Sequence, residues 1–570
     1  MTTRVLPSGK LALVLSSAAL AIFVVVSAAD FATSQQLFVN TTYYCLMAAV
    51  LCWAGTYLHA ARGLRKEAAI AWAEENWPGL VLALSVTVVA GLAVEPALRM
   101  LSDEANLVGT SKNLFTSKTA TFTISGKNYY DSYWDVDVAI DRRPALFPFL
   151  VSLLHAVRGY SHKNVFLFNL LVLPAYILIA YRFCKSLAGE TFALVACFFV
   201  VAHPIVLISI RSGGFDFFSN CFALLVIKSL LDFNREQSAS KLAILWINLC
   251  LFAEVRYETA LFIPPILLLL LLFRMVSWRL LRPYGFVYAL TPVFLAPRIW
   301  QSVVRGNIPE QEPGAIAFSV QNFSNNVREY LRPVLSPSDP AADHSAILIA
   351  LGVAGSLLWL RWAYTRIRAH EWPAPQLRFA LFTIAWVLLQ ATITFSYVWG
   401  RAQYPSVARL FIGIDTLLSL AAAWVLVQAL KRWGAFVAIL LAVAVFAIGV
   451  PVAAQHRRFN RLTQTRESRT TWSFFERLGE KRILIVTDRP NLFTIMDYGA
   501  LNFESARLDP YLFTAFARHL FYDIYVIQQI KLSTNAPLPG YEIWPSRKLD
   551  TMLEFQNDAD VLVRISRVAH

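Results

Sequence analysis

The sequence predicts an all-α polytopic membrane protein that carries a small α/β domain at its carboxyl end. Hydrophobic residues make up 57% of the 570 residues. Charged residues make up only 15%, against about 25% in soluble domains. Apolar runs of nearly membrane-spanning length, roughly 20 residues, follow one another up to residue 452. The remaining tail, 453–570, is soluble in character and contains short β-branched runs.

The apolar part predicts about thirteen transmembrane helices. A further apolar run at 145–158 is too short to cross the bilayer, and reading it as a span would invert every later loop. We therefore expect an interfacial or re-entrant helix there, on the outer side. The expected spans are 11–28, 43–61, 79–98, 164–183, 188–208, 217–233, 241–253, 259–273, 284–297, 345–361, 379–397, 407–429 and 434–452.

Basic residues predict the orientation of these helices. The chain has 51 Lys+Arg against 37 Asp+Glu, and arginines gather in short loops on alternate connections. This bias is typical of cytoplasmic loops and places the amino terminus inside and the tail outside. No motif for binding nucleic acid competes with this interpretation. The basic loops are 61–66, 182–185, 273–282, 361–370 and 431–434.

The tail predicts a small α/β domain outside the membrane. A helix-like stretch at 470–480 precedes three runs rich in β-branched residues. These expected strands are 482–488, 523–530 and 560–568.

Charged residues that interrupt the apolar pattern gather on the outer face. A charge at the bilayer centre costs about 2.5–3.5 kcal/mol even on the mildest scale, so these side chains must lie at span ends or line a wet cavity. Glu254, Tyr257 and Glu258 stand in EVRYE (254–258), and Arg409 ends GRAQYPSVAR (400–409). We expect these four residues to line the cavity.

The first external loop, 99–163, opens with Asp103 and Glu104. On local grounds these acids fit the N-cap of a surface helix at 103–115. A carboxylate near the membrane surface can also act as a general base towards a hydroxyl, if cations stabilise the leaving anion. The outer-side arginines that could supply this charge are Arg143, Arg256, Arg401 and Arg409.

Three features follow one another between roughly 80 and 235. They are the acidic pair, a basic residue before a proline-containing amphipathic helix (RRPALFPFLVSLLHAVRG, 142–159), and an acid at the outer end of a later span (GGFD, 213–216). This order resembles that of the GT-C glycosyltransferases, and closest among them the group of protein O-mannosyltransferases and lipid A aminoarabinose transferases. RAQYPSVARLF (401–411) is a weaker match to the same group.

The resemblance implies an integral-membrane glycosyltransferase that uses a polyprenyl-phosphate-linked sugar donor. Asp103 would be the general base of an inverting single displacement, with Glu104 and Asp216 as further catalytic acids. The acceptor would be a lipid, a glycan or a protein on the outer side. The residues expected to bind the donor phosphate are Arg143, Arg256, Arg401 and Tyr404.

The resemblance also divides the chain and suggests its location. Residues 1–78 would form two extra amino-terminal transmembrane helices, and 79–452 the GT-C-like catalytic module. The tail from 453 would be the outer domain. We expect a multi-pass protein of the bacterial inner membrane, with the amino terminus in the cytoplasm and the tail in the periplasm.

The chain departs from the family pattern near its donor-binding residue. Many members have Lys-Pro-Pro where this chain has Arg143-Pro144-Ala145, and Arg142 stands where an acid sometimes precedes the basic residue. No cofactor is expected with certainty, and a divalent metal stays open. The six cysteines lie in or beside apolar spans without a CxxC motif, so they indicate neither disulfides nor a zinc site.

Three other functions compete with the glycosyltransferase. A transporter or glycolipid flippase suits the number of spans, although the sequence shows no internal repeat. A ligase-like enzyme would share the donor but transfer a whole glycan. A non-catalytic assembly protein would use the outer domain to recruit partners. The residues leave the sugar and the acceptor open.

Overall fold

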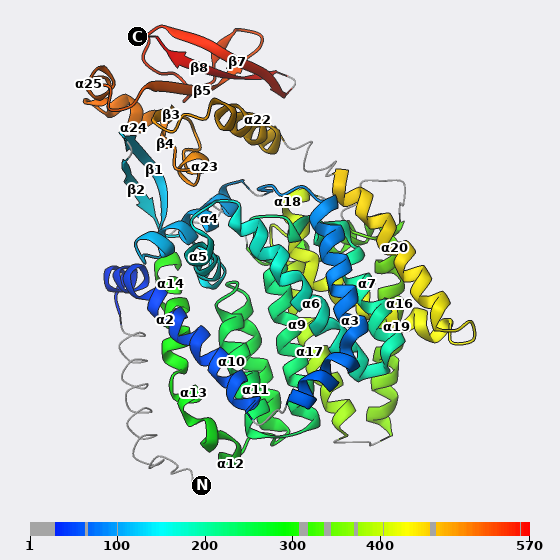
Figure 1. The fold of residues 1–570 in the computed structure, drawn as a ribbon. Helices are drawn as coiled ribbons and strands as arrows, with labels where there is room; N and C mark the ends of the chain where they lie inside the picture. Colours follow the sequence, from blue (N-terminus) through cyan, green and yellow to red (C-terminus); the bar gives the residue numbers. More distant parts are fainter. Residues whose placement is uncertain are drawn as a thin grey trace.

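A helical body and a sheet domain at one of its ends make up the molecule (Figure 1). The structure is a computed structural model. It describes residues 29–62, 66–99, 101–130, 132–306, 317–335, 344–369, 374–402, 404–455, 463–558 and 560–569.

Within the described ranges, seven helices are long and apolar enough to cross a membrane. An eighth span arises if α7 (Glu190–Ala202) and α8 (Pro204–Ile210), which bend by 77° at their break, are one. The predicted thirteen spans are therefore not confirmed, and the first of them, 11–28, lies outside the described residues. The seven are α2 (Phe31–Ala60), α3 (Lys66–Ala93), α6 (Asn164–Ala188), α16 (Ala346–Arg368), α17 (Pro375–Ser396), the run Ser406–Ala429 that ends in α19 (Ile412–Ala429), and α20 (Ala435–Gln455).

Several expected spans prove to be short or broken helices. The run at 284–297 divides into η2 (Arg282–Tyr284), α13 (Gly285–Ala289) and α14 (Thr291–Gly306). Prolines at 283 and 292 stand at the starts of these pieces, where a missing backbone N–H costs least. The unbroken 20-residue helix α9 (Asp216–Arg235) covers the expected span 217–233. The remaining helices are α10 (Ala239–Ala253), η1 (Thr259–Phe262), α11 (Ile263–Leu272), α12 (Trp278–Leu281), α15 (Val320–Leu335), α18 (Pro405–Ala408) and η3 (Arg409–Phe411).

The sheet domain contains strands from two distant parts of the chain, 122–139 and 483–568. Its strand order is β2-β1-β4-β3-β5-β8-β7, with β6 paired to β5. Strands β3 (Ile483–Val486), β5 (Asp523–Lys531) and β8 (Val561–Val568) confirm the three expected runs. The sequence missed β4 (Gly499–Leu501), β6 (Ala536–Pro537) and β7 (Leu549–Asp558). It also missed the hairpin of β1 (Phe122–Tyr129) and β2 (Ser132–Ala139).

The hairpin comes from the first external loop and joins the tail through β1 and β4, which pair at Gly126 and Ala500. The expected boundary at 453 therefore marks where the tail begins in the sequence. It does not bound the sheet domain, because that domain also contains β1 and β2. The helices that pack on this sheet are α22 (Thr463–Leu478), which overlaps the expected helix at 470–480, α23 (Asn491–Thr494), α24 (Phe503–Leu508) and α25 (Leu512–Ala517).

The helix expected at 103–115 is present as α4 (Leu101–Thr116), but it is buried rather than superficial. It packs against α5 (Leu146–Arg158) and α23, beneath the sheet domain (Figure 1). Lys112 Nζ lies 2.7 Å from Asp497 Oδ1 and 2.8 Å from the carbonyl oxygen of Thr494. The sheet domain therefore holds the helix that begins with the acidic pair.

Helix α5 corresponds to the short apolar run at 145–158. It has 13 residues and is no full span, as expected. Its apolar face is not at the surface, however, because Phe147, Phe149 and Val151 are fully buried. The apolar face of α5 instead packs against α4 and α6.

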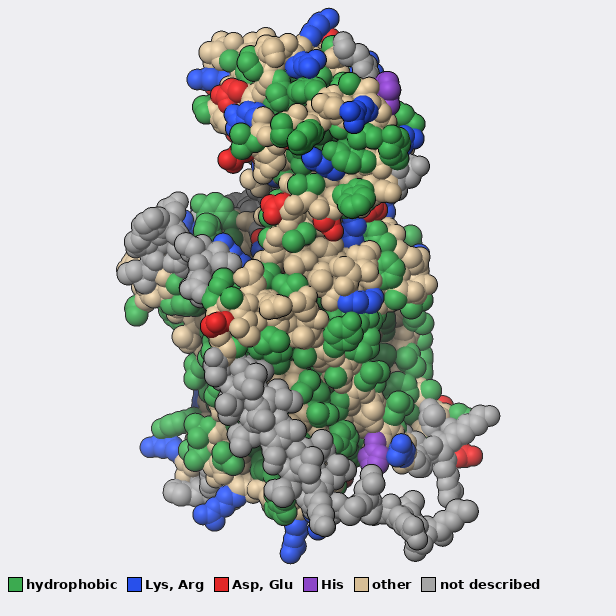
Figure 2. Space-filling model, turned by 90° about the vertical axis from the view of Figure 1, so that its left-hand side faces the viewer, with side chains coloured by type: hydrophobic (Ala, Val, Ile, Leu, Met, Phe, Trp, Pro, Cys, Tyr) green, Lys and Arg blue, Asp and Glu red, His purple; other side chains and the backbone are tan. Residues whose placement is uncertain are grey.

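The surface of the helical body is apolar in its middle and basic at one end on the face in Figure 2. On the face in Figure 2, hydrophobic side chains cover the middle of the body. Lys and Arg project at the end away from the sheet domain. Arg274, Arg279, Arg366 and Lys431, from three of the predicted cytoplasmic loops, are exposed.

Candidate functional site

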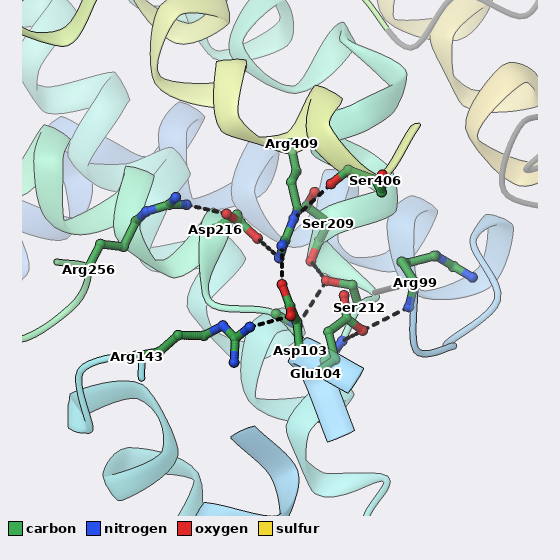
Figure 3. A network of polar contacts seen from close by, with 12 residues as sticks. Arg99, Asp103, Glu104, Arg143, Ser209, Ser212, Asp216, Arg256, Ser406 and Arg409 are labelled. Carbon is green, nitrogen blue, oxygen red and sulfur yellow. Dashed lines mark hydrogen bonds and ion pairs between the residues drawn. The ribbon is translucent and has the colours of Figure 1, made fainter. Parts of the chain in front are cut away.

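Two carboxylates and three guanidinium groups meet where α4, α9 and η3 begin (Figure 3). We call this group the acid–arginine cluster; it consists of Asp103, Asp216, Arg143, Arg256 and Arg409. The sequence predicted all five residues for the site, although they span 306 positions of the chain.

Arg409 joins the two acids. Its Nη2 lies 2.8 Å from Asp103 Oδ2 and its Nη1 lies 2.8 Å from Asp216 Oδ2. Arg143 Nη2 pairs with the other oxygen of Asp103, and Arg256 Nη1 pairs with the other oxygen of Asp216. The result is a chain of alternating charges, Arg143–Asp103–Arg409–Asp216–Arg256.

Each member of the cluster stands at the end of an element rather than in its middle. Asp103 lies in the first turn of α4 and Asp216 is the first residue of α9. Arg256 follows α10, and Arg409 begins the short 3-10 turn η3. Charges at helix ends can reach a polar site without crossing the apolar interior, which explains why the sequence places them there.

Arg143 is oriented by its own neighbours. Its Nη1 and its backbone N–H lie 2.8 and 3.0 Å from Asp141 Oδ1. Gln301 of α14 donates to the carbonyl oxygens of both residues. Neither Asp141 nor Gln301 was among the predicted site residues, because nothing in the local sequence links 141 to 301.

Glu104 lies behind the cluster rather than in it. Its side chain is buried and its Oε2 accepts hydrogen bonds from the backbone N–H groups of Arg99 and Gly213, both at 2.9 Å. A Cβ at Gly213 would stand 3.1 Å from Glu104 Oε2, so glycine permits this close approach. Glu104 therefore connects α4 to the loop that leads into Asp216.

The loop before Asp216 has a second support that the sequence did not reveal. Asn169 of α6 donates to the carbonyl oxygens of Ser212 and Gly214, at 2.9 and 2.8 Å. An asparagine within an apolar span is a signal that could have identified this contact.

The EVRYE junction is divided between two environments. Arg256 and Glu258 form an ion pair beside Asp216. Glu254 instead accepts a hydrogen bond from the backbone N–H of Arg298 at 3.0 Å, and Arg298 Nη2 donates to the carbonyl oxygen of Tyr257 at 2.9 Å. Glu254 and the backbone of Tyr257 therefore fix α14 to the junction.

Asp103 is the most exposed member of the cluster. Its side chain keeps 26% of its accessible surface, against 3% for Asp216 and 10% for Arg256. A substrate in this space would meet Asp103 before the other carboxylate.

Two arginines of the cluster influence the protonation of Asp103. Burial alone would raise the pKa of Asp103, but Arg143 and Arg409 outweigh it, and the pKa lies below the ordinary value of an aspartate. Burial raises the pKa of Glu104 above that of an ordinary glutamate. Asp103 is therefore available as a carboxylate over the physiological range.

Two predicted donor-binding residues are not joined to the cluster. Arg401 and Tyr404 are exposed, and the described contacts include no hydrogen bond or ion pair from either side chain to the five residues. Arg409, expected to line the cavity and named among the arginines that could stabilise a leaving anion, takes the central place instead.

A cavity of about 600 Å³ opens among α6, α9, α16, α17 and α19. Most of its lining is apolar, including Ala223, Ile227 and Trp424. Asn220 and Thr416 are polar lining residues that bind one another at 2.8 Å. Asn220 stands one helical turn after Asp216, so this part of the cavity lies next to the cluster.

A metal ion finds little support in the cluster, because both carboxylates already use their oxygens on guanidinium groups. In the described part of the chain, His203, His344 and Asp415 form a group whose potential ligand atoms lie within 4.8 Å of one another. None of these three residues was a predicted metal ligand.

Comparisons with known proteins bear on the same regions. The family model of the dolichyl-phosphate-mannose-protein mannosyltransferases matches residues 142–300, which include Arg143, Asp216 and Arg256. No curated protein sequence matches the chain.

Solved structures match a far larger part of the chain. ArnT from Cupriavidus metallidurans bound to undecaprenyl phosphate is 12% identical, with a TM-score of 0.50 over 85% of this chain and 97% of ArnT. Apo ArnT from the same organism is 12% identical, with a TM-score of 0.51 over 86% and 98%. The apo oligosaccharyltransferase of Archaeoglobus fulgidus is 11% identical, with a TM-score of 0.45 over 80% and 70%.

The similarity to ArnT confirms the GT-C fold that the sequence predicted. The family model and the fold together support a GT-C-type membrane glycosyltransferase.

Proposed function

We propose that this protein transfers a sugar from a polyprenyl-phosphate donor to an acceptor on the outer side of the membrane, with Asp103 as the general base. The observation that carries the proposal is the acid–arginine cluster, in which an accessible carboxylate lies between arginines from distant parts of the chain. The reaction needs both a base and positive charge at the leaving group.

The proposed reaction is a single displacement. The Asp103 carboxylate takes the proton of the acceptor hydroxyl as that oxygen attacks the anomeric carbon. The bond from this carbon to the phosphate oxygen breaks, and the polyprenyl phosphate leaves with the electron pair. Attack opposite the leaving group inverts the anomeric centre.

The arginines of the cluster would bind the departing phosphate. Arginine stays charged and binds phosphate in a bidentate manner, which suits Arg143, Arg256 and Arg409. Without a phosphate, these guanidinium groups are balanced by Asp103, Asp216 and Glu258. Asp216 would thus orient the arginines, while Glu104 would position α4 rather than react. Arg401 and Tyr404 stay proposed as donor contacts at the rim.

The apolar cavity supports a lipid-linked donor. Its lining of Ala223, Ile227 and Trp424 suits an isoprenoid chain, and Asn220 places it within one helical turn of Asp216. ArnT, which shares the fold, has been crystallised with undecaprenyl phosphate. A lipid tail in the cavity would direct its phosphate to the arginines.

We further propose that the protein lies in the bacterial inner membrane with the sheet domain in the periplasm. The basic end of the helical body in Figure 2 would then face the cytoplasm, in agreement with the positive-inside rule. The acceptor, whether lipid, glycan or protein, would approach the cluster from the periplasm.

Incubation of the purified protein with a panel of radiolabelled polyprenyl-phosphate sugars tests the proposal. We expect transfer of label by the wild type and a loss of at least about a hundredfold in kcat for Asp103→Asn, since general-base catalysis contributes about 10²–10⁴-fold. Asp232→Asn is a matched control. It also removes an ion-paired carboxylate, but that of the Lys228–Asp232 pair far along α9.

Full activity of Asp103→Asn would rule out Asp103 as the base. Movement of a lipid-linked sugar across liposomes with its covalent structure unchanged would instead favour the transporter or flippase. Transfer of a whole oligosaccharide rather than one sugar would favour the ligase-like enzyme.

A further inference from the structure

A second buried polar group lies around Asp415 in α19. The Asp415 side chain is fully buried. Tyr330 Oη donates to its Oδ1 at 2.6 Å, and His344 Nδ1 lies 2.8 Å from its Oδ2. His203 Nδ1 is 3.7 Å from Oδ1. We call Asp415, Tyr330, His344, His203 and Ser419 the Asp415 network.

A carboxylate at this depth is costly. Asp415 lies in the candidate span Ser406–Ala429, and its described partners are two histidines and a tyrosine rather than an arginine or lysine. Burial of a carboxylate is tolerated only when hydrogen bonds satisfy it. An ionisable residue inside a span therefore needs a reason, and none of the five cluster residues touches Asp415.

The hydrogen bonds of His203 disfavour a metal ion in this group. The backbone N–H of Ser345 donates to His203 Nδ1 at 3.1 Å. Nε2 therefore carries the proton and lies 3.2 Å from Ser419 Oγ, which itself donates to the carbonyl oxygen of Phe199 at 3.1 Å. Because both ring nitrogens are occupied, a metal could bind His203 only by breaking one of these bonds.

The network connects two segments that lead to the acid–arginine cluster. Asp415 follows Arg409 by six residues along η3 and α19, which is about 9 Å of helix. His203 stands at the 77° break between α7 and α8, and the chain runs from α8 through Gly213 to Asp216. Asp415 therefore lies on the segment that carries Arg409, and His203 lies on the segment that leads to Asp216. Arg409 and Asp216 form the 2.8 Å ion pair of the cluster.

Aromatic packing strengthens the same connection. The ring of Tyr330 stacks on Phe411 with centroids 5.0 Å apart, and the ring of His344 meets Phe411 edge-on at 5.9 Å. Phe411 is two residues from Arg409 in η3. The partners of Asp415 thus also hold the turn that presents Arg409.

We propose that Asp415 is a positioning residue: through Tyr330 and His344, whose neighbour Ser345 donates to His203, it holds Asp216 and Arg409 at the separation that catalysis requires. The proposal rests on the proposed function. A misplacement of about 1 Å in a catalytic group can cost about a hundredfold in rate, so a fixed support behind the pair has a large effect on kcat.

The test combines transfer kinetics with hydrogen exchange on the full-length protein. Asp415→Asn keeps the size of the side chain but replaces one acceptor oxygen by an NH₂ group that faces a donor. We expect kcat to fall by about tenfold or more, with the donor KM within about twofold. Amide exchange should accelerate in segments 203–216 and 405–411. Tyr330→Phe, which removes one hydrogen bond and keeps the stacked ring, should show an intermediate loss.

Asn248→Leu is the matched control. Asn248 is equally buried and binds Trp53, Tyr57 and Ser229 at 2.7–2.9 Å, in a network between α2, α9 and α10. This variant should lower the melting temperature but leave kcat and exchange in the two segments at wild-type values.

Equal losses of kcat in Asp415→Asn and Asn248→Leu, or unchanged exchange in the two segments, would overturn the positioning role. One equivalent of a transition metal in the wild type that is lost from Asp415→Asn would replace it by a metal site. Exchange needs no substrate, so a wild type that transfers no sugar would overturn the proposed function and leave the exchange result to decide the positioning role.

Discussion

Arg409 contacts both carboxylates of the acid–arginine cluster, and together with Arg143 it opposes the effect of burial on the pKa of Asp103. The pKa of Asp103 is depressed in the folded protein. Its charge, and the stability that its ion pairs contribute, are present above the ordinary pKa of aspartate. Both are lost only as the pH falls through the depressed value.

Removal of Arg409 should shift this titration upward. In Arg409→Gln the pKa of Asp103 rises, because burial then opposes one arginine instead of two. Besides a lower kcat, we expect kcat/KM at pH 5 relative to pH 7.5 to be several-fold lower in Arg409→Gln than in the wild type. pH profiles of both proteins measure this ratio. An identical ratio in the two would show that Arg409 does not control the base.

The cluster shows how far single residues can be predicted. Asp103, Arg143, Asp216 and Arg256 were identified because charges at span ends are costly and rare. The choice among Arg401, Tyr404 and Arg409 depends on how the chain turns through α18 and η3. That turn is fixed by packing against Tyr330 and Phe395, which the local sequence does not contain.

Helix α4 connects the sheet domain to the acid–arginine cluster. It begins at the acidic pair, and its Lys112 is held by Asp497 and Thr494 of the sheet domain. Asn106, one turn beyond Asp103, accepts a hydrogen bond from Asn491 of α23 at 2.9 Å. Contacts in the tail therefore determine where Asp103 stands.

Lys112→Met should loosen this attachment. The substitution keeps an apolar stem but removes a buried ammonium group whose hydrogen bonds contribute about 1.5–3 kcal/mol. We expect a melting temperature lower by about 2–4 °C and a kcat reduced several-fold. Thermal melts and transfer assays measure both. Lys163→Met is the control, since the exposed Lys163–Glu476 pair contributes about 0–1 kcal/mol. Similar effects of the two substitutions would contradict the conclusion that contacts between α4 and the sheet domain position Asp103.

Elements of uniform composition were predicted better than those of mixed composition. Long apolar runs such as α6 and α20 needed only their length. The run at 284–297 passed as a span on composition, but it breaks at Leu290, just before Pro292. The pairing of the β1–β2 hairpin with the tail was missed because Gly126 and Ala500, which pair, are far apart in the chain.

At the scale of the whole molecule, the distribution of charge predicts which end of the protein faces the outside of the cell membrane. Single cysteines at Thr534, in the sheet domain, and at Arg366, at the basic end of α16, report on the two sides. A background without Cys45 and Cys52, which are only partly buried, avoids native thiols. An impermeant maleimide applied to intact spheroplasts should label Thr534→Cys, and Arg366→Cys only after lysis. The opposite pattern would invert the orientation and remove the outer-side mechanism.

The pairing of β1 with β4 also has a consequence for biosynthesis. Gly126 and Ala500 are 374 positions apart, since 500 − 126 = 374. At about 5–20 residues per second, the hairpin is made roughly 20–75 s before its partner strand. During that interval β1 is an open edge, the kind of surface that invites wrong pairing. The helix bearing the proposed base thus acquires its final support only when the ribosome has nearly finished, so in an unfinished chain the sheet domain would not yet hold Asp103 in place.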